Sequence, residues 1–141
     1  MAQLPTPSEG IVLTHFIVSD DVERSRRFYT EVLGGEIVFR GDSSKGEPTI
    51  IALANGWVTI NDGGGPTPDK PNVTLVPPGD PEHASAFLNI RVADIEAVYQ
   101  QWSARGAKFL TPPLDRGVEI RCYMRDPDGH LIEVGQLKRP L

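Results

Sequence analysis

Glu133 is the residue in this sequence whose setting most suggests chemistry, because it is a carboxylate inside an apolar segment. Residues 130–136 read HLIEVGQ, a pattern that predicts the last strand of the chain. A carboxylate in such a strand needs a partner, since an unpaired charge away from water is strongly destabilising. Glu133 therefore either acts in a cleft or forms a salt bridge with Arg91 or Arg121.

Arg121 and Tyr123 are further candidate binding residues. The alternation of side chains along a strand places both on one face of the predicted strand 118–125. They could bind a polar or anionic part of a ligand, or Arg121 could pair with Glu119 at the surface. Trp57 and Phe87 could be core residues or the walls of a cleft that holds a flat ligand.

Other residues that could in principle do chemistry are better interpreted as structural or solvent-exposed. Cys122 is the only cysteine, so an intramolecular disulfide is excluded, and the pattern favours a buried strand residue over a nucleophile. His83 lies in a connector and His130 beside a turn, where histidines are usually solvated. The run 63–65 (GGG) lacks the lysine of a phosphate-binding loop and is interpreted as a linker.

Residues 11–61 predict a first series of strands and one helix. The apolar segment 11–18 predicts a buried strand, and Asp20 or Asp21 can cap a helix that ends at Gly34 and Gly35. Strands are then expected at 36–40, 49–54 and 57–61. The last two are joined by a turn at Asn55-Gly56.

The second series repeats this order. A strand at 86–92 precedes a helix that Asp94 caps and Gly106 ends. Strands follow at 107–110, 118–125 and 130–136. The repeat predicts an α+β fold of two βαβββ modules, forming an open, curled mixed β-sheet cleft with helices outside. We expect a flexible N-terminus at 1–10, modules at 11–76 and 86–137, a Pro-rich connector at 77–85 and a tail at 138–141.

Composition restricts the classes of partner. The net charge is −5, and no block of Lys or Arg provides the cationic footprint that nucleic acid requires. No apolar run approaches the roughly 20 residues that span a bilayer, and no secretion signal is recognised at the N-terminus. We therefore expect a cytoplasmic protein with no nucleic-acid or membrane partner.

Two motifs resemble those of the vicinal oxygen chelate superfamily, which includes glyoxalases, bleomycin-resistance proteins and extradiol dioxygenases. Residues 19–34 resemble its first-helix signature, and residues 126–133 (DPDGHLIE) resemble its last hairpin. The resemblance covers 11–136 and implies the fold described above. It also implies a ligand or substrate in the inter-module cleft and, in many members, homodimers and one divalent ion such as Zn, Ni, Fe or Mn.

The resemblance implies an incomplete set of metal ligands in this chain. Glu133 matches the final-strand carboxylate, whereas Ile60 and Phe87 occupy other expected ligand positions and cannot coordinate metal. Asn89 shares a face with Phe87 but is a weak ligand. His15 points into the cleft only if Asp20 is the helix cap.

The alternative cap, Asp21, places Thr14 at the ligand position and turns His15 to the opposite face. We favour the Asp20 alignment, which turns His15 into the cleft beside Leu13 and Ile17. The reason is that it keeps these residues of the strand toward the helices: Val12, Thr14, Phe16 and Val18. The candidate metal ligands are then His15 and Glu133, so the cofactor is either absent or one divalent ion.

Three functions follow as hypotheses. The favoured one is binding of a small, partly aromatic molecule without a complete metal site. The alternative is a metal-dependent lyase, isomerase or extradiol dioxygenase in which Glu133 is catalytic, as metal ligand or base. A module for protein contacts has little support. The expected ligand-binding residues are His15, Trp57, Phe87, Asn89, Arg121, Tyr123 and Glu133.

Overall fold

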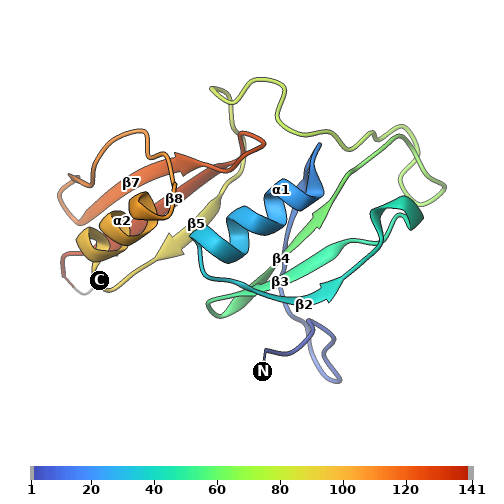
Figure 1. Cartoon of the computed structure of the whole chain (residues 1–141), viewed down its shortest axis with the longest axis horizontal. Helices are drawn as coiled ribbons and strands as arrows, with labels where there is room; N and C mark the ends of the chain where they lie inside the picture. Colours follow the sequence, from blue (N-terminus) through green and yellow to red (C-terminus); the bar gives the residue numbers. More distant parts are fainter. Residues whose placement is uncertain (1, 140–141) are drawn as a thin grey trace. The chain divides into compact units, whose positions relative to one another are not determined.

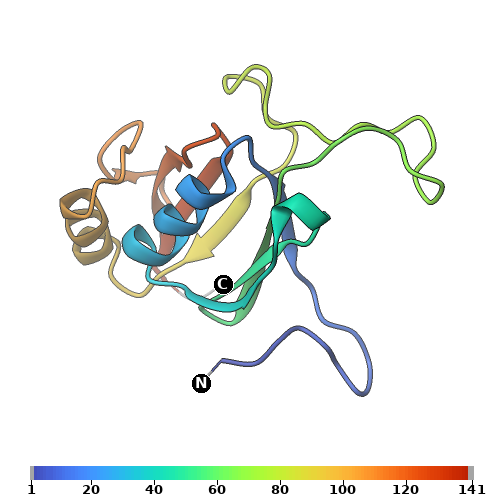
Figure 2. The ribbon, with the colours of Figure 1, turned by 45° about the vertical axis from the view of Figure 1, so that its right-hand side comes forward.

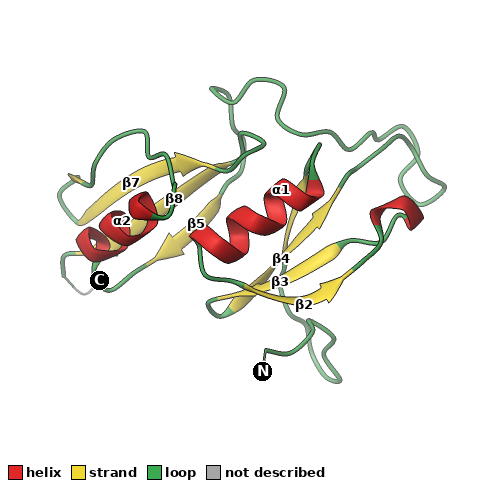
Figure 3. Ribbon diagram, viewed as in Figure 1, coloured by secondary structure: helices red, strands yellow, loops and turns green. Residues whose placement is uncertain are grey.

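The computed structural model of the protein describes residues 2–139, which fall into two compact units with a boundary between Gly79 and Asp80. Each unit contains a four-stranded mixed sheet and one longer helical segment (Figures 1 and 3). The boundary lies inside the expected connector. Met1, Pro140 and Leu141 lie outside the described residues, so the predicted N-terminus and tail are described only in part.

The first unit is built from strands β1 (His15–Val18), β2 (Glu36–Arg40), β3 (Thr49–Leu53) and β4 (Gly56–Asn61). Its helical parts are α1 (Val22–Arg27), the π-helix η1 (Phe28–Val32) and the short 3₁₀ helix η2 (Ser43–Lys45). The spatial order is β1-β4-β3-β2, with β1 parallel to β4 and the other pairs antiparallel.

The second unit repeats this plan with β5 (Leu88–Arg91), α2 (Ile95–Ala104), β6 (Leu114–Asp115), β7 (Glu119–Arg125) and β8 (Leu131–Leu137). Its order, β5-β8-β7-β6, matches that of the first unit, and β5 is parallel to β8. The predicted pair of βαβββ modules is therefore confirmed. Among the described residues, no helix is long and apolar enough to cross a membrane.

The helical face of the first sheet forms the core of that unit. Ile17, Ile51, Val58 and Ile60 are each at most 2% exposed. They share one face by register, since Ile17 pairs with Ile60 and Ile51 with Val58. The helical segment contributes buried Phe28, Tyr29, Val32 and Leu33 to the same core.

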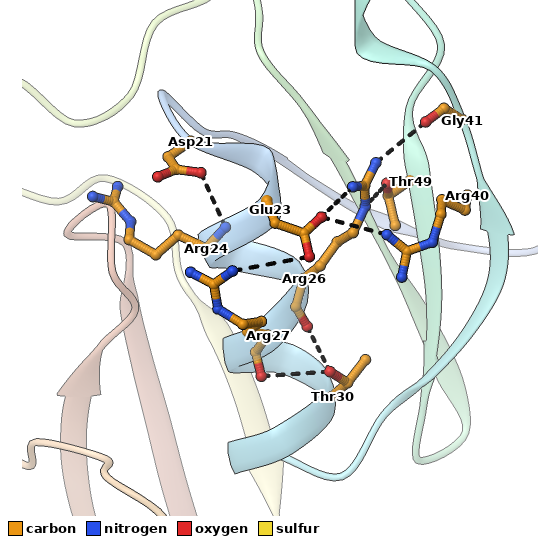
Figure 4. A network of polar contacts seen from close by, with 9 residues as sticks. All are labelled: Asp21, Glu23, Arg24, Arg26, Arg27, Thr30, Arg40, Gly41 and Thr49. Atoms are coloured by element: carbon orange, nitrogen blue, oxygen red, sulfur yellow. Dashed lines mark hydrogen bonds and ion pairs between the residues drawn. The ribbon is translucent and has the colours of Figure 1, made fainter.

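Arg26 ties α1 to this sheet through polar contacts (Figure 4). Its Nε donates to the buried Thr49 Oγ1 at 2.7 Å, and one terminal nitrogen donates to the Gly41 carbonyl at 3.2 Å. The Glu23 carboxylate accepts a hydrogen bond from the other terminal nitrogen of Arg26 at 2.5 Å, and it also forms an ion pair with Arg40 at 3.4 Å. The hydrogen bond from Arg26 is the main reason that the pKa of Glu23 lies below its usual value.

Helix α1 begins after Asp21, whose carboxylate accepts from the Arg24 backbone N–H at 3.1 Å. Helix α2 begins in the same way after Asp94, which accepts from Ala97 at 3.1 Å. Asp20 instead pairs with the Arg24 side chain at 2.7 Å. The preference for Asp20 as the cap is therefore wrong.

The cap decides which way His15 points. Ile17 lies four residues before Asp21, as Ile90 lies four residues before Asp94, and both pair with buried residues of the central strand. Strand alternation then places His15 on the helix-covered face with Ile17. Phe16, which is 48% exposed, lies on the opposite face, contrary to the favoured alignment.

Two other strand predictions needed correction. Strand β1 starts at His15 and not at Ile11, because its pairing with β4 begins only at His15 and Val58. In this parallel register β4 starts opposite residue 13, so residues 11 and 12 have no partner strand. Residues 107–110 form only an isolated bridge, between Phe109 and Met124. The segment from β4 to β5 runs as long loops (Figure 2), with isolated bridges between Gly64 and Leu75 and between Thr67 and Lys70.

The turn between β3 and β4 also differs by one residue from the expectation. Leu53 pairs with Gly56, so Ala54 and Asn55 form the turn and Gly56 is the first residue of β4. Ala54 takes a φ of 52°, in the left-handed region that is unfavourable for a residue with a Cβ. Turn preferences alone did not predict this register.

Candidate functional site

Glu133 lies in the middle of β8, on the face of the second sheet opposite α2. Its neighbours Ile132 and Val134 are fully buried on the other face, where Gln136 accepts a hydrogen bond from the first residue of α2. We call the face that carries Glu133 the open face of the second sheet. Strand pairing places the following residues on it: Asn89, Arg91, Arg121, Tyr123, Glu133 and Gly135.

Three side chains from the two neighbouring strands, β5 and β7, satisfy the Glu133 carboxylate. Asn89 Nδ2 donates to Oε1 at 2.7 Å, and the Tyr123 hydroxyl donates to Oε2 at 2.5 Å. An Arg91 nitrogen lies 3.5 Å from Oε1. Glu133 is only 6% exposed, so these donors replace the water that a charged carboxylate would otherwise require.

The Tyr123 hydroxyl is held in its protonated form by this arrangement. Its hydrogen bond to Glu133 is the largest cause of a raised pKa, followed by burial and by the negative charge of Glu133. Tyr123 therefore acts as a hydrogen-bond donor at neutral pH. Its ring also meets Phe87 edge to face, with centroids 5.9 Å apart, and Phe87 is 41% exposed.

Of the two salt bridges considered for Glu133, the structure contains the one to Arg91. Arg121 pairs instead with Glu119 at 3.3 Å, and Arg91 reaches the same carboxylate at 2.7 Å. The hydrogen bond from Arg91 is the main reason that the pKa of Glu119 is lowered. Glu119 and Glu133 thus hold Arg91 from two sides.

Gly135 provides the space that Arg91 occupies. A Cβ at this position would collide with the Arg91 guanidinium group. The two residues are direct partners in the pairing of β5 with β8. A glycine inside a strand is a recognised sign of such a close approach, so this signal was present in the sequence.

A hollow of about 550 Å³ lies beside this network on the second unit. It is lined by Asn89, Arg91, Arg116, Val118, Glu119, Arg121 and Leu137. Asn89 and Arg91 belong to both the hollow and the Glu133 network, whereas Tyr123 and Phe87 do not line it. The hollow is therefore adjacent to the Tyr123–Glu133 pair and does not lie over it.

Arg116 was not recognised from the sequence. It follows the two-residue strand β6, which was not predicted, and its backbone N–H donates to the Glu119 carbonyl at 2.8 Å. Gly117, with a φ of 97°, completes this turn. The segment Asp115-Arg116-Gly117 contains a turn signal but no feature that places the arginine beside β7.

His15 and Trp57 belong to the first unit, so their part in a site with Glu133 stays a prediction. His15 lies on the helix-covered face of its sheet, and the Trp57 indole donates to the Gln3 carbonyl at 2.7 Å. The cleft expected between the modules also stays a prediction. Asn89, Arg121, Tyr123, Phe87 and Glu133 belong to one unit and come together around its open face.

The first-unit counterpart of Glu133 is Thr59 and not Ile60. Glu133 pairs with Tyr123 and Asn89, and Thr59 pairs in the same way with Ile50 and Phe16. An alignment of the two hairpins through Gly56 and Gly129 would place Ile60 at the position of Glu133, but this alignment fails because the two turns differ in length. Ile60 points into the helical core, so it was never a candidate for an open-face ligand position.

The donors on the open face do not fit a catalytic metal centre, which usually has three protein ligands. Glu133 is a carboxylate, but Asn89 offers an amide, and Tyr123 and Arg91 are donors that already satisfy Glu133. Within residues 2–139 there is no group of three or more His, Cys, Asp or Glu side chains that could hold an ion.

The surroundings of Cys122 and His83 do not suggest a chemical role for either residue. Cys122 is 1% exposed on the helical face of β7, and burial raises the pKa of its thiol to about 11. The prediction of a buried strand residue is confirmed. His83 is exposed and pairs with Asp80 at 2.6 Å.

Known structures share this fold. The chain is 21% identical to TnmS3, an antibiotic binding protein from Streptomyces sp. CB03234, with a TM-score of 0.68 over 94% of this chain and 100% of that chain. A glyoxalase/bleomycin resistance protein/dioxygenase from Nocardioides is 20% identical, with a TM-score of 0.70 over 96% and 92%. TioX from Micromonospora sp. ML1 is 19% identical, with a TM-score of 0.66 over 91% and 98%.

A family model matches most of the chain. The match runs from residue 12 to residue 134 and therefore includes the first βαβββ module, the second as far as the middle of β8, and Glu133. Its extent agrees with the repeat of strand orders and with the structural neighbours. The chain belongs to the Glyoxalase/Bleomycin resistance protein/Dioxygenase superfamily.

Proposed function

We propose that this protein binds a small, partly aromatic molecule on the open face of its second sheet, without a complete metal site. The observation that carries the proposal is the state of Glu133. Both of its carboxylate oxygens receive donors from the chain itself, Asn89 and Tyr123, with Arg91 nearby. A carboxylate held in this way organises a binding surface more readily than it coordinates an ion.

The aromatic preference rests on Phe87 and Tyr123. Their edge-to-face contact leaves Phe87 partly exposed, which offers a flat apolar surface beside polar donors. Ligand sites commonly combine apolar walls with a few fixed polar groups. The naming of one structural neighbour as an antibiotic binding protein supports a small-molecule role for this fold.

The test combines ligand screening with metal removal. Protein dialysed against a chelator is titrated with a panel of charged and uncharged two-ring aromatic molecules, and backbone amide NMR signals are followed. We expect saturable shifts at Phe87, Asn89 and Tyr123 that do not change when Zn²⁺, Ni²⁺, Fe²⁺ or Mn²⁺ is added. Failure of the whole panel to give saturable shifts would refute the binding proposal.

Phe87→Ala should weaken binding of those panel members by about tenfold, the scale of one lost aromatic contact. Phe39→Ala is the matched control, because Phe39 is similarly exposed at 40% but lies in β2 of the first unit. Equal losses in both variants would contradict a site on the second sheet.

A metal-dependent lyase, isomerase or dioxygenase is the second candidate, and the buried carboxylate of Glu133 is the observation that favours it. Protein purified without chelators would then contain one tightly held ion per chain, and Glu133→Gln would lose it. If metal content is negligible in the unaltered protein, or is the same in Glu133→Gln, this candidate fails.

A further inference from the structure

We infer that the hollow lined by Arg91, Arg116 and Arg121 recognises the carboxylate of a singly charged ligand. This inference rests on the proposed function and specifies the class of ligand. The first argument is charge. Three guanidinium groups line or border a region that contains two carboxylates, Glu119 and Glu133, so one positive charge remains in a protein whose net charge is −5.

Arg116 supplies that surplus charge. Within residues 2–139 its side chain has no hydrogen bond or ion pair, whereas Arg91 is held by Glu119 and Glu133 and Arg121 by Glu119. Arg121 uses one terminal nitrogen in a contact of 3.3 Å, which leaves further N–H groups for a ligand. Arg116 and Arg121 are therefore the groups that would bind the anion directly.

Arg91 and Glu119 position this pair of arginines. Glu119 accepts from Arg91 at 2.7 Å and from Arg121 at 3.3 Å, so it joins the two guanidinium groups through one carboxylate. The Arg91 guanidinium group also lies in the space that the missing Cβ of Gly135 leaves open. A guanidinium group whose orientation is already fixed loses less freedom when it binds an oxyanion.

The size and lining of the hollow indicate what accompanies the carboxylate. Its volume of about 550 Å³ falls within the range of small-molecule sites, roughly 300–1,000 Å³. Val118 and Leu137 line it with side chains that are 42% and 41% exposed, which suits an apolar body. A single surplus cation matches one carboxylate, whereas a dianion such as a phosphate ester would remain partly uncompensated.

The test compares naphthoate with its uncharged analogue naphthamide on the full-length protein by NMR titration. We expect naphthoate to shift signals at Arg116, Val118 and Arg121 and to bind about tenfold more tightly than naphthamide, the scale of one charge-assisted contact. Its affinity should fall as salt is raised, while that of naphthamide should not.

Arg116→Gln should remove most of the advantage of naphthoate. The fold should be unaffected, since the side chain has no polar partner among the described residues, and thermal unfolding checks this. Lys45→Gln is the control, because it removes one exposed positive charge from η2 in the first unit.

Two results would overturn the inference: absence of saturable naphthoate binding, or equal naphthoate affinity in Arg116→Gln and the unaltered protein. Equal affinities for naphthoate and naphthamide would also overturn it, but the proposed binding of aromatic molecules would then stand.

Discussion

The Tyr123 hydroxyl donates a hydrogen bond of 2.5 Å to Glu133 Oε2 across the paired strands β7 and β8. Tyr123 and Glu133 are direct partners in the ladder, so the contact depends only on strand register and on two rotamers. It joins an aromatic ring that contacts Phe87 to a carboxylate that is 6% exposed. This pair is the structural centre of the open face.

Removal of the hydroxyl in Tyr123→Phe should destabilise the protein by about 1–3 kcal/mol, because one oxygen of a buried carboxylate loses its donor. Urea unfolding measures the change. Tyr99→Phe is the control, since Tyr99 packs on Phe109 and its hydroxyl has no hydrogen bond within residues 2–139. Comparable losses in the two variants would mean that the Tyr123 hydrogen bond adds no stability.

The ionisation of Tyr123 should occur above the ordinary tyrosine pKa of 10.0. The folded state holds this proton more tightly than the unfolded state, so the stabilisation is complete below about pH 10 and declines as pH rises through the native pKa. Ultraviolet absorbance of the phenolate measures the titration. In Glu133→Gln the pKa of Tyr123 should fall toward 10.0, because the hydrogen bond to the carboxylate and its negative charge are lost. An unchanged Tyr123 titration would mean that Glu133 does not raise this pKa.

Gly135→Ala should displace Arg91 while leaving the sheet intact, because the new Cβ meets the end of a flexible side chain and not backbone. The pKa of Glu119, which Arg91 lowers, should then rise toward the usual 4.5. Side-chain carboxyl NMR measures this pKa. Gly56→Ala is the matched control, since a Cβ there meets nothing within 4 Å and its φ is not positive. A Glu119 pKa that does not respond to Gly135→Ala would refute the steric relationship.

Arg26 should contribute more to stability than its neighbour Arg27. Arg26 is 12% exposed and donates to Thr49 and Gly41, whereas Arg27 is 56% exposed and lies 3.9 Å from Glu23. Arg26→Ala leaves a buried Thr49 hydroxyl without its partner and should cost about 1–3 kcal/mol. Arg27→Ala should cost less than about 0.5 kcal/mol, as exposed ion pairs usually do. Chemical denaturation of both variants decides the matter.

Much of the architecture was evident from local patterns. Apolar alternation, helix caps and glycine stops predicted the repeated order of elements, and both sheets have that order. Alternation within one strand also placed Arg121 and Tyr123 on the same face, because neighbouring side chains of a strand must point to opposite sides. The isolated carboxylate in β8 marked Glu133 as the residue around which polar groups gather.

Relationships between strands were decided only by the tertiary structure. His15 lies on the helix-covered face because Asp21, and not Asp20, caps α1, and Thr59 replaces Ile60 as the counterpart of Glu133 because the hairpin turns differ in length. A one-residue change in register reverses the direction of every side chain, and local preferences distinguish such alternatives by too little free energy. The position of Arg116 and the space over Gly135 likewise exist only once β5, β6, β7 and β8 are paired, since each depends on residues distant in the chain.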